Sequence, residues 1–432
     1  MTRLKPVKLK TLSQDDLKKL RRRGLCNLKD IRKTVMEIVE NVKSRGDIAL
    51  IEYTRLYDGV ELNPENLRIL REEMDAAYNT LDDPILEAME FIRSMVEKVC
   101  LGFLPENRLI EPERGLRIHV LWKPINSIGV YIPGGANPYP STIFMTVTLA
   151  KTVRVGRVVV CTPPRNVKPV VLAAMKIAGV DEAFRVGGAQ AIAAMAYGTE
   201  TIPKVDKIVG PGSPYVEIAK RIVYGDVGVD LPAGPSEILI LADDSADPML
   251  VAVDLLSQAE HPYSSAILIS MSEKLALKVS EILDSMVDSN TFESFERGGL
   301  FVADNLEEAI EFVNYYAPEH LEIMLEEPEE VLRMVKNAGS VFIGPLTPVS
   351  LGDYATGVSH VLPTGGAARF SSGLNPLHFM KDLIVQIVDV NGFKTLKKFA
   401  EVMANIEGLR MHYNALKVRD SLNGLQFKHS PP

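Results

Sequence analysis

A glutamate and a histidine stand side by side in an otherwise apolar stretch of the chain. Residues 314–325 read NYYAPEHLEIML, in which Glu319 and His320 directly follow a proline. Buried strands and helices rarely place two ionisable residues together in such a setting. A histidine with an ordinary pKa of about 6.5 can exchange protons near neutral pH, and an adjacent carboxylate can assist it. The two residues are therefore either a proton-handling pair or surface neighbours.

A second stretch combines residue types that bind metals. Residues 255–262 read LLSQAEHP, which places Gln258 and His261 three positions apart at the end of a predicted helix. Side chains with this spacing lie on one helix face. An amide oxygen and an imidazole nitrogen can both bind zinc, although glutamine is an uncommon ligand and two ligands do not complete a site. Taken alone, this stretch is better explained as a polar helix end.

Two further stretches each contain a carboxylate and a histidine. SLGDYATGVSHVLPTGG contains Asp353 and His360, and IEGLRMHYNA contains Glu407 and His412. Surface residues would give the same pattern. However, the chain has only 7 histidines, and four of them lie beside glycine, proline or a carboxylate in these few stretches. This concentration predicts one shared polar site.

Two glycine-rich turns could approach a phosphate. Residues 131–138, YIPGGANP, and residues 210–215, GPGSPY, each join a predicted strand to a predicted helix. Glycine lets the backbone come close to an anion at a helix N-terminus. Neither turn has the GxGxxG pattern of dinucleotide-binding folds, so the nucleotide signal is weak and plain turns would look the same.

Alternating strands and helices must position these residues. After a mainly helical region that ends near residue 103, short β-branched runs alternate with helices of about 10 to 15 residues, which is typical of parallel sheets covered on both faces. One such helix is predicted to begin at Pro248 with Asp247 as its cap. The part after about residue 375 is predicted to be mostly helical. Ligands of parallel sheets usually bind at the carboxyl ends of the strands, so we expect the site there.

Composition excludes several functional classes. The chain has 432 residues and a net charge of −8, which suggests two or three domains and argues against a nucleic-acid binder. The basic run KKLRRR, residues 18–23, is interpreted as a solvated helix face. The start lacks a signal-peptide pattern, no run of about 20 apolar residues occurs, and three scattered cysteines fit a reducing compartment. We therefore expect a cytoplasmic protein with no membrane partner.

Eight long motifs of the chain resemble the histidinol dehydrogenase family. In chain order they are GVYIPGG, VGGAQAIAAMAYGT, VDKIVGPG, DLPAGPSEILILAD, ADPMLVAVDLLSQAEH, NYYAPEHLEI, SLGDYATGVSHVLPTGG and ARFSSGL. The resemblance extends over nearly the whole chain, from NVKSRGDIALIEYTRLYD to EGLRMHYNA. It implies a histidine-biosynthesis enzyme that uses NAD and one zinc ion per chain. The implied reaction oxidises L-histidinol to L-histidine through L-histidinaldehyde.

The resemblance also implies roles for individual residues, each named here by its motif match. The implied acid–base pair is Glu319 and His320. The implied zinc ligands, which also contact substrate, are Gln258, His261, Asp353 and His412. Further substrate-contacting positions are Ser236, His320, His360 and Glu407. The implied NAD-binding positions are Tyr131, Gln190 and Ser213, of which Ser213 replaces the asparagine that the family usually has, so this chain departs from the family at a cofactor contact.

The same resemblance implies an α/β fold with two incomplete Rossmann-like parallel-sheet domains. The implied parts are an N-terminal segment (1–26), a zinc and catalytic domain (27–128 plus 237–374), an NAD-binding domain (129–236) and a C-terminal tail domain (375–432). It further implies a homodimer whose tail carries Glu407 and His412 into the partner's site. Two alternative functions share the same residues, namely a zinc-dependent hydrolase without a dinucleotide and a non-catalytic metal-binding relative.

Overall fold

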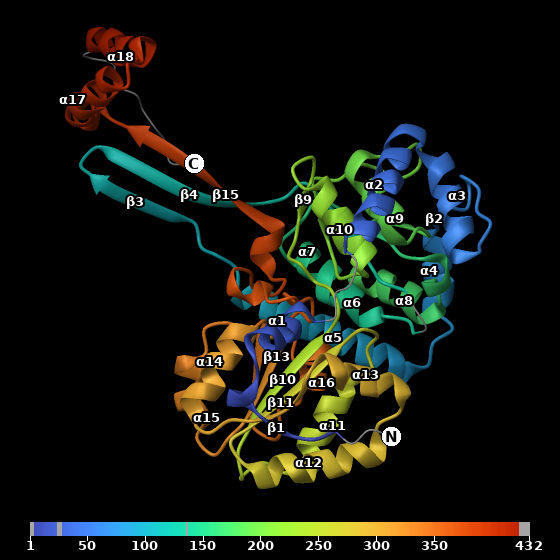
Figure 1. Ribbon diagram of the computed structural model, residues 1–432. Helices are drawn as coiled ribbons and strands as arrows, with labels where there is room; N and C mark the ends of the chain where they lie inside the picture. The colour runs from blue at the N-terminus through green and yellow to red at the C-terminus, as the bar shows by residue number, and fades with distance from the viewer. Residues whose placement is uncertain (1–3, 24–27, 135–136, 423–432) are drawn as a thin grey trace. The chain divides into compact units, whose positions relative to one another are not determined.

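Two six-stranded sheets, with the helices that cover them, form the larger part of the protein (Figure 1). The computed structural model describes residues 4–23, 28–134 and 137–422. Contacts divide the chain into unit 1, Met1–Phe103 with Ile125–Phe379, and unit 2, Leu104–Pro124 with Met380–Pro432. Both six-stranded sheets belong to unit 1 and are parallel apart from one edge pair. The predicted α/β class is therefore confirmed.

Every described strand pair of the first sheet, called sheet A, is parallel. The strand order reverses between β10 and β13, because β11 and β12 extend the sheet on one side and β14 on the other. The sequence did not predict β13 as a strand, since ionisable residues interrupt its apolar run. In spatial order the strands are β1 (Val7–Lys8), β12 (Gly299–Val302), β11 (Ser265–Ser270), β10 (Glu237–Ala242), β13 (His320–Met324) and β14 (Ser340–Ile343).

Helices cover both faces of sheet A. Ile238 and Ile240 of β10 pack in one core with α11 and α12, whereas Leu239 and Leu241 pack in another core with α14. Alternate residues of a strand point to opposite faces, so the continuous apolar run EILILA serves both cores. The helices of this layer are α1 (Gln14–Arg22), α11 (Pro248–Ala259), α12 (Glu273–Met286), α13 (Ser289–Arg297), α14 (Leu306–Tyr316), α15 (Pro328–Met334) and α16 (Val349–Tyr354).

The predicted start of α11 is confirmed. Asp247 is the N-cap residue, its side chain accepts a hydrogen bond from the backbone N–H of Met249 at 2.7 Å, and Pro248 occupies the first turn. This cap fixes where α11 begins and therefore where its last turn falls.

The second sheet, called sheet B, is parallel except that β2 pairs antiparallel with β7. Its strand order reverses between β5 and β8. In spatial order the strands are β2 (Arg68–Ile69), β7 (Glu182–Phe184), β6 (Arg157–Cys161), β5 (Ser127–Tyr131), β8 (Lys207–Val209) and β9 (Gly228–Val229).

Helices also flank sheet B, and four of them come from the N-terminal part of the chain. α2 and α3 pack with α9 and α10 in one core, whereas the sequence-based grouping placed residues 27–128 with residues 237–374. A π-helical turn at Phe144–Thr148 lies between α6 and α7. The helices are α2 (Leu28–Arg45), α3 (Asp47–Asp58), α4 (Arg71–Tyr78), α5 (Asp83–Gly102), α6 (Pro140–Ile143), α7 (Leu149–Thr152), α8 (Pro169–Ala178), α9 (Gly188–Tyr197) and α10 (Pro214–Val223).

Unit 2 consists of a small antiparallel sheet and two helices. β15 (Met380–Val388) pairs with β4 (Leu116–Pro124), which pairs with β3 (Arg108–Glu113). α17 (Val390–Ile406) and α18 (Arg410–Lys417) follow. The helical pattern after residue 375 is therefore present, but β15 was not predicted, because its partner β4 lies far away in the sequence.

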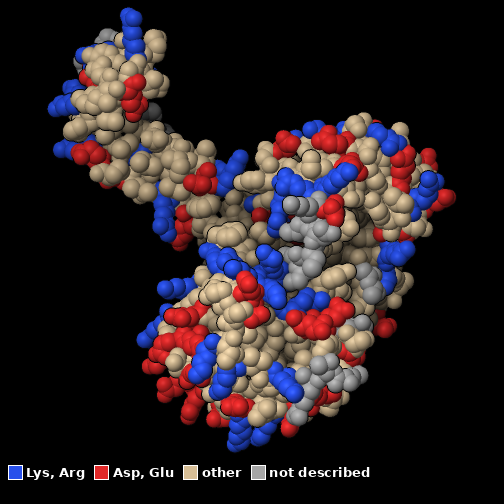
Figure 2. All heavy atoms as spheres, in the orientation of Figure 1, with Lys and Arg blue, Asp and Glu red and all other residues tan. Residues whose placement is uncertain are grey.

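The surface carries both signs of charge. Figure 2 shows acidic side chains gathered over α14 and α15, whose first turns contain Glu307, Glu308, Glu329 and Glu330. No helix among the described residues combines the length and the apolar character that crossing a membrane requires.

Candidate active site

Glu319 and His320 lie at the amino end of β13, beside β10. Their exposed fractions are 5% and 3%. Both side chains therefore lie in the protein interior, and the alternative that they are two surface neighbours is excluded.

Glu237, the first residue of β10, holds this pair through both its backbone and its side chain. Its N–H donates to Oε2 of Glu319 at 2.7 Å, and the N–H of Glu319 donates to Oε2 of Glu237 at 3.3 Å. The carbonyl oxygen of Glu237 lies 2.9 Å from Nδ1 of His320. A carbonyl can only accept, so Nδ1 carries a proton, and in the neutral imidazole the lone pair is at Nε2.

Carboxylates surround the His320 ring. Oε2 of Glu319 lies 3.4 Å from Nδ1, and Oδ1 of Asp353 lies 3.7 Å from Nε2. Burial lowers the pKa of His320, but the charges of Glu319 and Asp353 outweigh it and raise this pKa well above its ordinary value. Burial raises the pKa of Asp353, yet His320, with smaller contributions from His360 and His261, lowers it overall. Asp353 is therefore an anion beside three histidines.

The connections of the sheet bring the candidate metal ligands to this place. A helix that joins two parallel strands runs back along them, so the last turn of α11 returns to the amino ends of the strands. Gln258 and His261 lie on and just after that turn. The site on sheet A is consequently at the amino edge and not at the carboxyl edge that the sequence pattern led us to expect.

The side chain of Gln258 fits a metal ligand. It is 2% exposed, and its Oε1 has no hydrogen-bond partner among the described residues. A buried polar atom without a partner is costly, and a cation would supply one. No group of three or more His, Cys, Asp or Glu side chains suited to a metal occurs among the described residues. The predicted ligand set contains two such side chains in unit 1, His261 and Asp353. Its other two members are Gln258, which is not one of these four types, and His412, which belongs to unit 2.

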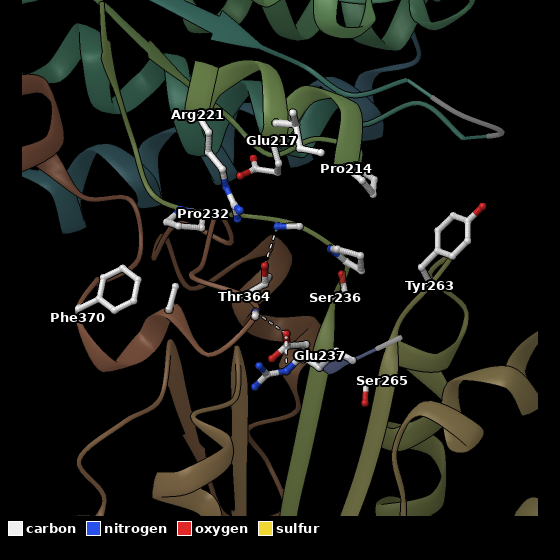
Figure 3. A pocket seen from close by; sticks show the side chains of 16 residues that line it. Pro214, Glu217, Arg221, Pro232, Ser236, Glu237, Tyr263, Ser265, Thr364 and Phe370 are labelled. Carbon is white, nitrogen blue, oxygen red and sulfur yellow. Dashed lines mark hydrogen bonds and ion pairs between the residues drawn. The ribbon is translucent and has the colours of Figure 1, made fainter. Parts of the chain in front are cut away.

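His360 and Ser236 lie next to these residues along the chain or in space. Nδ1 of His360 lies 2.9 Å from the backbone oxygen of Asp353, and its Nε2 lies 3.1 Å from Oγ1 of Thr142 in α6. Ser236 precedes Glu237 and lines a cavity of about 180 Å³ that Arg221 also borders (Figure 3). A polar ligand could reach Ser236 from this cavity.

The predicted cofactor-binding residues occupy the carboxyl edge of sheet B, around the point where its strand order reverses. Tyr131 ends β5, and its hydroxyl accepts the backbone N–H of Gly188 at 3.1 Å. Burial raises the pKa of Tyr131 to about 12, so it stays a phenol. Gln190 lies in the first turns of α9, and Ser213 is the exposed N-cap residue of α10, without a side-chain capping bond. This edge is where doubly wound sheets bind nucleotides.

Glu407 and His412 belong to unit 2. Glu407 is the residue after the last turn of α17, His412 lies in α18, and both are exposed. Their part in the site stays a prediction.

Sequence reasoning missed two residues of this network. Arg23 was included in a run interpreted as a solvated face, which is wrong for this residue because it is 5% exposed. Its Nε lies 2.8 Å from Oε1 of Glu237. The only sequence signal for Glu237 was a carboxylate at the start of an apolar strand, directly after the singled-out Ser236.

Comparisons with known proteins identify one family for the whole chain. A family model described as histidinol dehydrogenase matches residues 21–420. Histidinol dehydrogenase from Methanosarcina barkeri is 44% identical over 422 residues, covering 95% of this chain and 97% of the relative. The enzyme of that name from Aquifex aeolicus is 43% identical over 412 residues, covering 93% and 96%. The crystal structure of histidinol dehydrogenase from Elizabethkingia anophelis matches with a TM-score of 0.91 and 35% identity, covering 98% of this chain and 100% of that one. The chain therefore belongs to the histidinol dehydrogenase family, whose members are oxidoreductases.

Proposed function

We propose that the chain catalyses the NAD-dependent oxidation of L-histidinol to L-histidine through L-histidinaldehyde, with one zinc ion per chain. Family membership supports the substrate. The observation that carries the proposal is the buried Glu319–His320 pair, which lies beside Asp353 and on the strand next to Glu237.

His320 is the proposed base. Its Nδ1 is occupied by the carbonyl of Glu237, and its Nε2 has no hydrogen-bond partner among the described residues. In the neutral imidazole, Nε2 can therefore take the proton first from the alcohol of L-histidinol and later from the hydrate of the aldehyde. His320 must first lose the proton that its raised pKa favours. Because the ring is held through Nδ1, each proton transfer takes place at one defined atom.

Glu319 is proposed to activate the water that adds to the aldehyde. Its Oε2 is held by the N–H of Glu237, which fixes the carboxylate beside His320. Only the second oxidation needs this water, so the two residues divide the work between proton removal and hydration.

Gln258, His261, Asp353 and His412 are the proposed zinc ligands, of which Gln258 provides a buried oxygen without a partner. When bound, zinc supplies positive charge that orients the amino and imidazole nitrogens of the substrate. A ligand set without thiolates keeps that charge high. Ser236, His360 and Glu407 are proposed to contact the substrate around it.

Residues 129–236 are proposed to form the NAD-binding domain, with Tyr131, Gln190 and Ser213 as contacts. When bound, NAD accepts the hydride in each of the two oxidations. The N-terminus of α10, which begins at Pro214, offers backbone N–H groups to an anionic ligand.

A homodimer is proposed in which the tail contributes Glu407 and His412 to the partner's site. α17 exposes Phe399 and Ile406 by 70% and 73%, and α18 exposes Met411 by 74%. Figure 2 shows an uncharged area over these helices, bordered by charged side chains. Apolar side chains exposed together mark an interaction surface.

The buried free thiols of Cys100 and Cys161 fit the proposed cytoplasmic location, where disulfides are rare.

The test is NADH absorbance after the protein, NAD and L-histidinol are mixed. We expect two NADH per L-histidinol consumed, loss of turnover in His320→Asn, and full turnover in the matched surface variant Glu329→Gln on α15. Zinc-dependent cleavage without NADH would support the hydrolase, and zinc binding without any turnover would support the non-catalytic relative. Either result contradicts the proposal.

A further inference from the structure

Arg23 is a buried cation that lies outside the proposed catalytic and ligand-binding residues. It follows the last residue of α1, where its backbone has a left-handed φ of 51°. The guanidinium group contacts two places that lead directly to Glu319 and His320.

The first contact is with Glu237. Nε of Arg23 lies 2.8 Å from Oε1 of Glu237, and the same oxygen accepts the N–H of Gly365 at 2.7 Å. The other oxygen of Glu237 accepts the N–H of Glu319. The guanidinium contact is an ion pair and the other two partners are N–H donors, so all three contacts favour Glu237 as a carboxylate. Figure 3 shows Glu237 at the edge of the cavity, with its ion pair drawn as a dashed line.

The second contact is with the end of α14. A terminal nitrogen of Arg23 donates to the backbone oxygen of Tyr316 at 2.6 Å and to that of Ala317 at 3.3 Å, and the guanidinium lies 3.9 Å from the centre of the Tyr316 ring. Carbonyls at a helix end need such donors. The chain runs from this helix end through one proline to Glu319 and His320, so Arg23 also fixes where that segment starts.

We propose that Arg23 is a positioning residue for the acid–base pair, acting through Glu237 and through the end of α14. The inference rests on the proposed function, because it assigns Arg23 to the same reaction. Without its guanidinium, Glu237 and the 316–320 segment lose their common anchor, and Nε2 of His320 is no longer held at one place.

Two physical arguments favour this role over plain stabilisation. Replacing a buried ion pair by apolar side chains of similar volume is often neutral or stabilising, so the pair is weak evidence for a purely stabilising role. Burial raises the pKa of Glu237 to about 7, and the charge of Arg23 acts against that rise. Loss of Arg23 therefore favours protonated Glu237, which accepts the N–H groups of Glu319 and Gly365 less strongly than the carboxylate does.

The experiment uses Arg23→Ala in the full-length enzyme, with the steady-state constants for L-histidinol measured separately. A displacement of about 1 Å lowers turnover by about 100-fold, so we expect kcat to fall on that order while KM changes by less than about threefold. Zinc content should equal that of the wild type. The matched control is Arg22→Ala, an exposed arginine at the end of the same helix, which should keep wild-type constants.

Added guanidinium provides a readout that a purely structural role would not move. The cavity of about 180 Å³ is lined by Arg23 and Glu237, so a small planar cation can enter the space left by the side chain. Guanidinium chloride at low millimolar concentration should raise the kcat of Arg23→Ala at least about tenfold, whereas sodium chloride at equal ionic strength should leave it unchanged. It should not restore Glu237→Gln, which lacks the carboxylate.

Three results would overturn the inference: wild-type kcat in Arg23→Ala, a loss that guanidinium does not reverse, or equal rescue by sodium chloride. If Arg23→Ala does not fold, Arg23→Lys decides, because lysine keeps the charge but cannot bridge Glu237 and the helix end in the same plane. A folded Arg23→Lys with at least about tenfold lower kcat supports the inference, and an unchanged kcat refutes it. An inactive wild type would instead refute the proposed function.

Discussion

Nε2 of His320 lies 3.7 Å from Oδ1 of Asp353, so the proposed base and a proposed metal ligand share one electrostatic environment. The two residues come from different elements, β13 and α16, and meet at the amino edge of sheet A. Each therefore affects the protonation of the other, and this coupling can be measured in the metal-free protein.

Asp353→Asn should lower the pKa of His320. The Asp353 carboxylate favours the imidazolium and contributes to the raised pKa of that histidine, so its removal shifts the titration downward. Histidine ring NMR signals followed against pH, with His320→Asn for assignment, measure this. Zinc affinity should also fall by more than the about 10- to 100-fold typical of outer-shell partners. An unchanged His320 titration would contradict the coupling.

Glu319→Gln should slow aldehyde oxidation more than alcohol oxidation. Only the second step needs activated water, and removal of a general base typically costs about 100- to 10,000-fold. Supplying L-histidinaldehyde directly separates the two half-reactions. His320→Asn should impair both. Equal losses in both half-reactions of Glu319→Gln would show that the proposed division of roles is wrong.

Ser213→Asn should tighten NAD binding. Ser213 is the exposed N-cap residue of α10, and asparagine reaches further with an additional donor. One added hydrogen bond of about 1 kcal/mol corresponds to about fivefold in affinity. Calorimetric titration with NAD measures the change, and titration with L-histidinol serves as the internal control. Weaker or unchanged NAD binding would count against Ser213 as a cofactor contact.

Glu322→Gln should stabilise the folded protein relative to the wild type, by an amount that grows as the pH rises. Burial and the neighbouring Asp254 raise the pKa of the fully buried Glu322 from 4.5 to about 9. The folded wild type keeps this proton while the unfolded chain releases it, so stability is present at low pH and is lost as pH rises between these values, by up to about 1.4 kcal/mol per pH unit. Glutamine carries no such penalty.

Melting temperatures of the wild type and Glu322→Gln at about pH 5, 7 and 9, in one metal state, check this prediction. The difference between the two proteins should grow with pH, whereas the exposed variant Glu330→Gln should follow the wild type. Parallel curves for Glu322→Gln and the wild type would rule out a raised pKa at Glu322.

Refolding a mixture of His320→Asn and His412→Asn should recover about a quarter of wild-type activity. If the tail crosses a two-fold interface, about half of randomly paired dimers are hybrids, and one site in each hybrid is intact. Activity assays on hybrids confirmed by mass spectrometry measure this. Activity near zero would place His412 in the site of its own chain.

The sequence determined the α/β class, because short β-branched runs alternate with amphipathic helices throughout the central part of the chain. It also determined local features such as the Asp247 cap of α11, whose hydrogen bond involves residues only two positions apart. The Glu319–His320 pair was visible for the same reason, since both residues are neighbours in an apolar stretch.

Tertiary structure decided what the pair touches. Glu237 and Arg23 lie far from Glu319 in the chain and reach it only because β10 pairs with β13 and α1 ends beside α14. The pairing of β15 with β4 is of the same kind. The local sequence pattern shows which residues are apolar or charged. Pairing between distant strands and the burial of Arg23 depend instead on the free energy of packing the whole chain. The edge of sheet A at which the site forms was likewise decided by the path of its connecting helices.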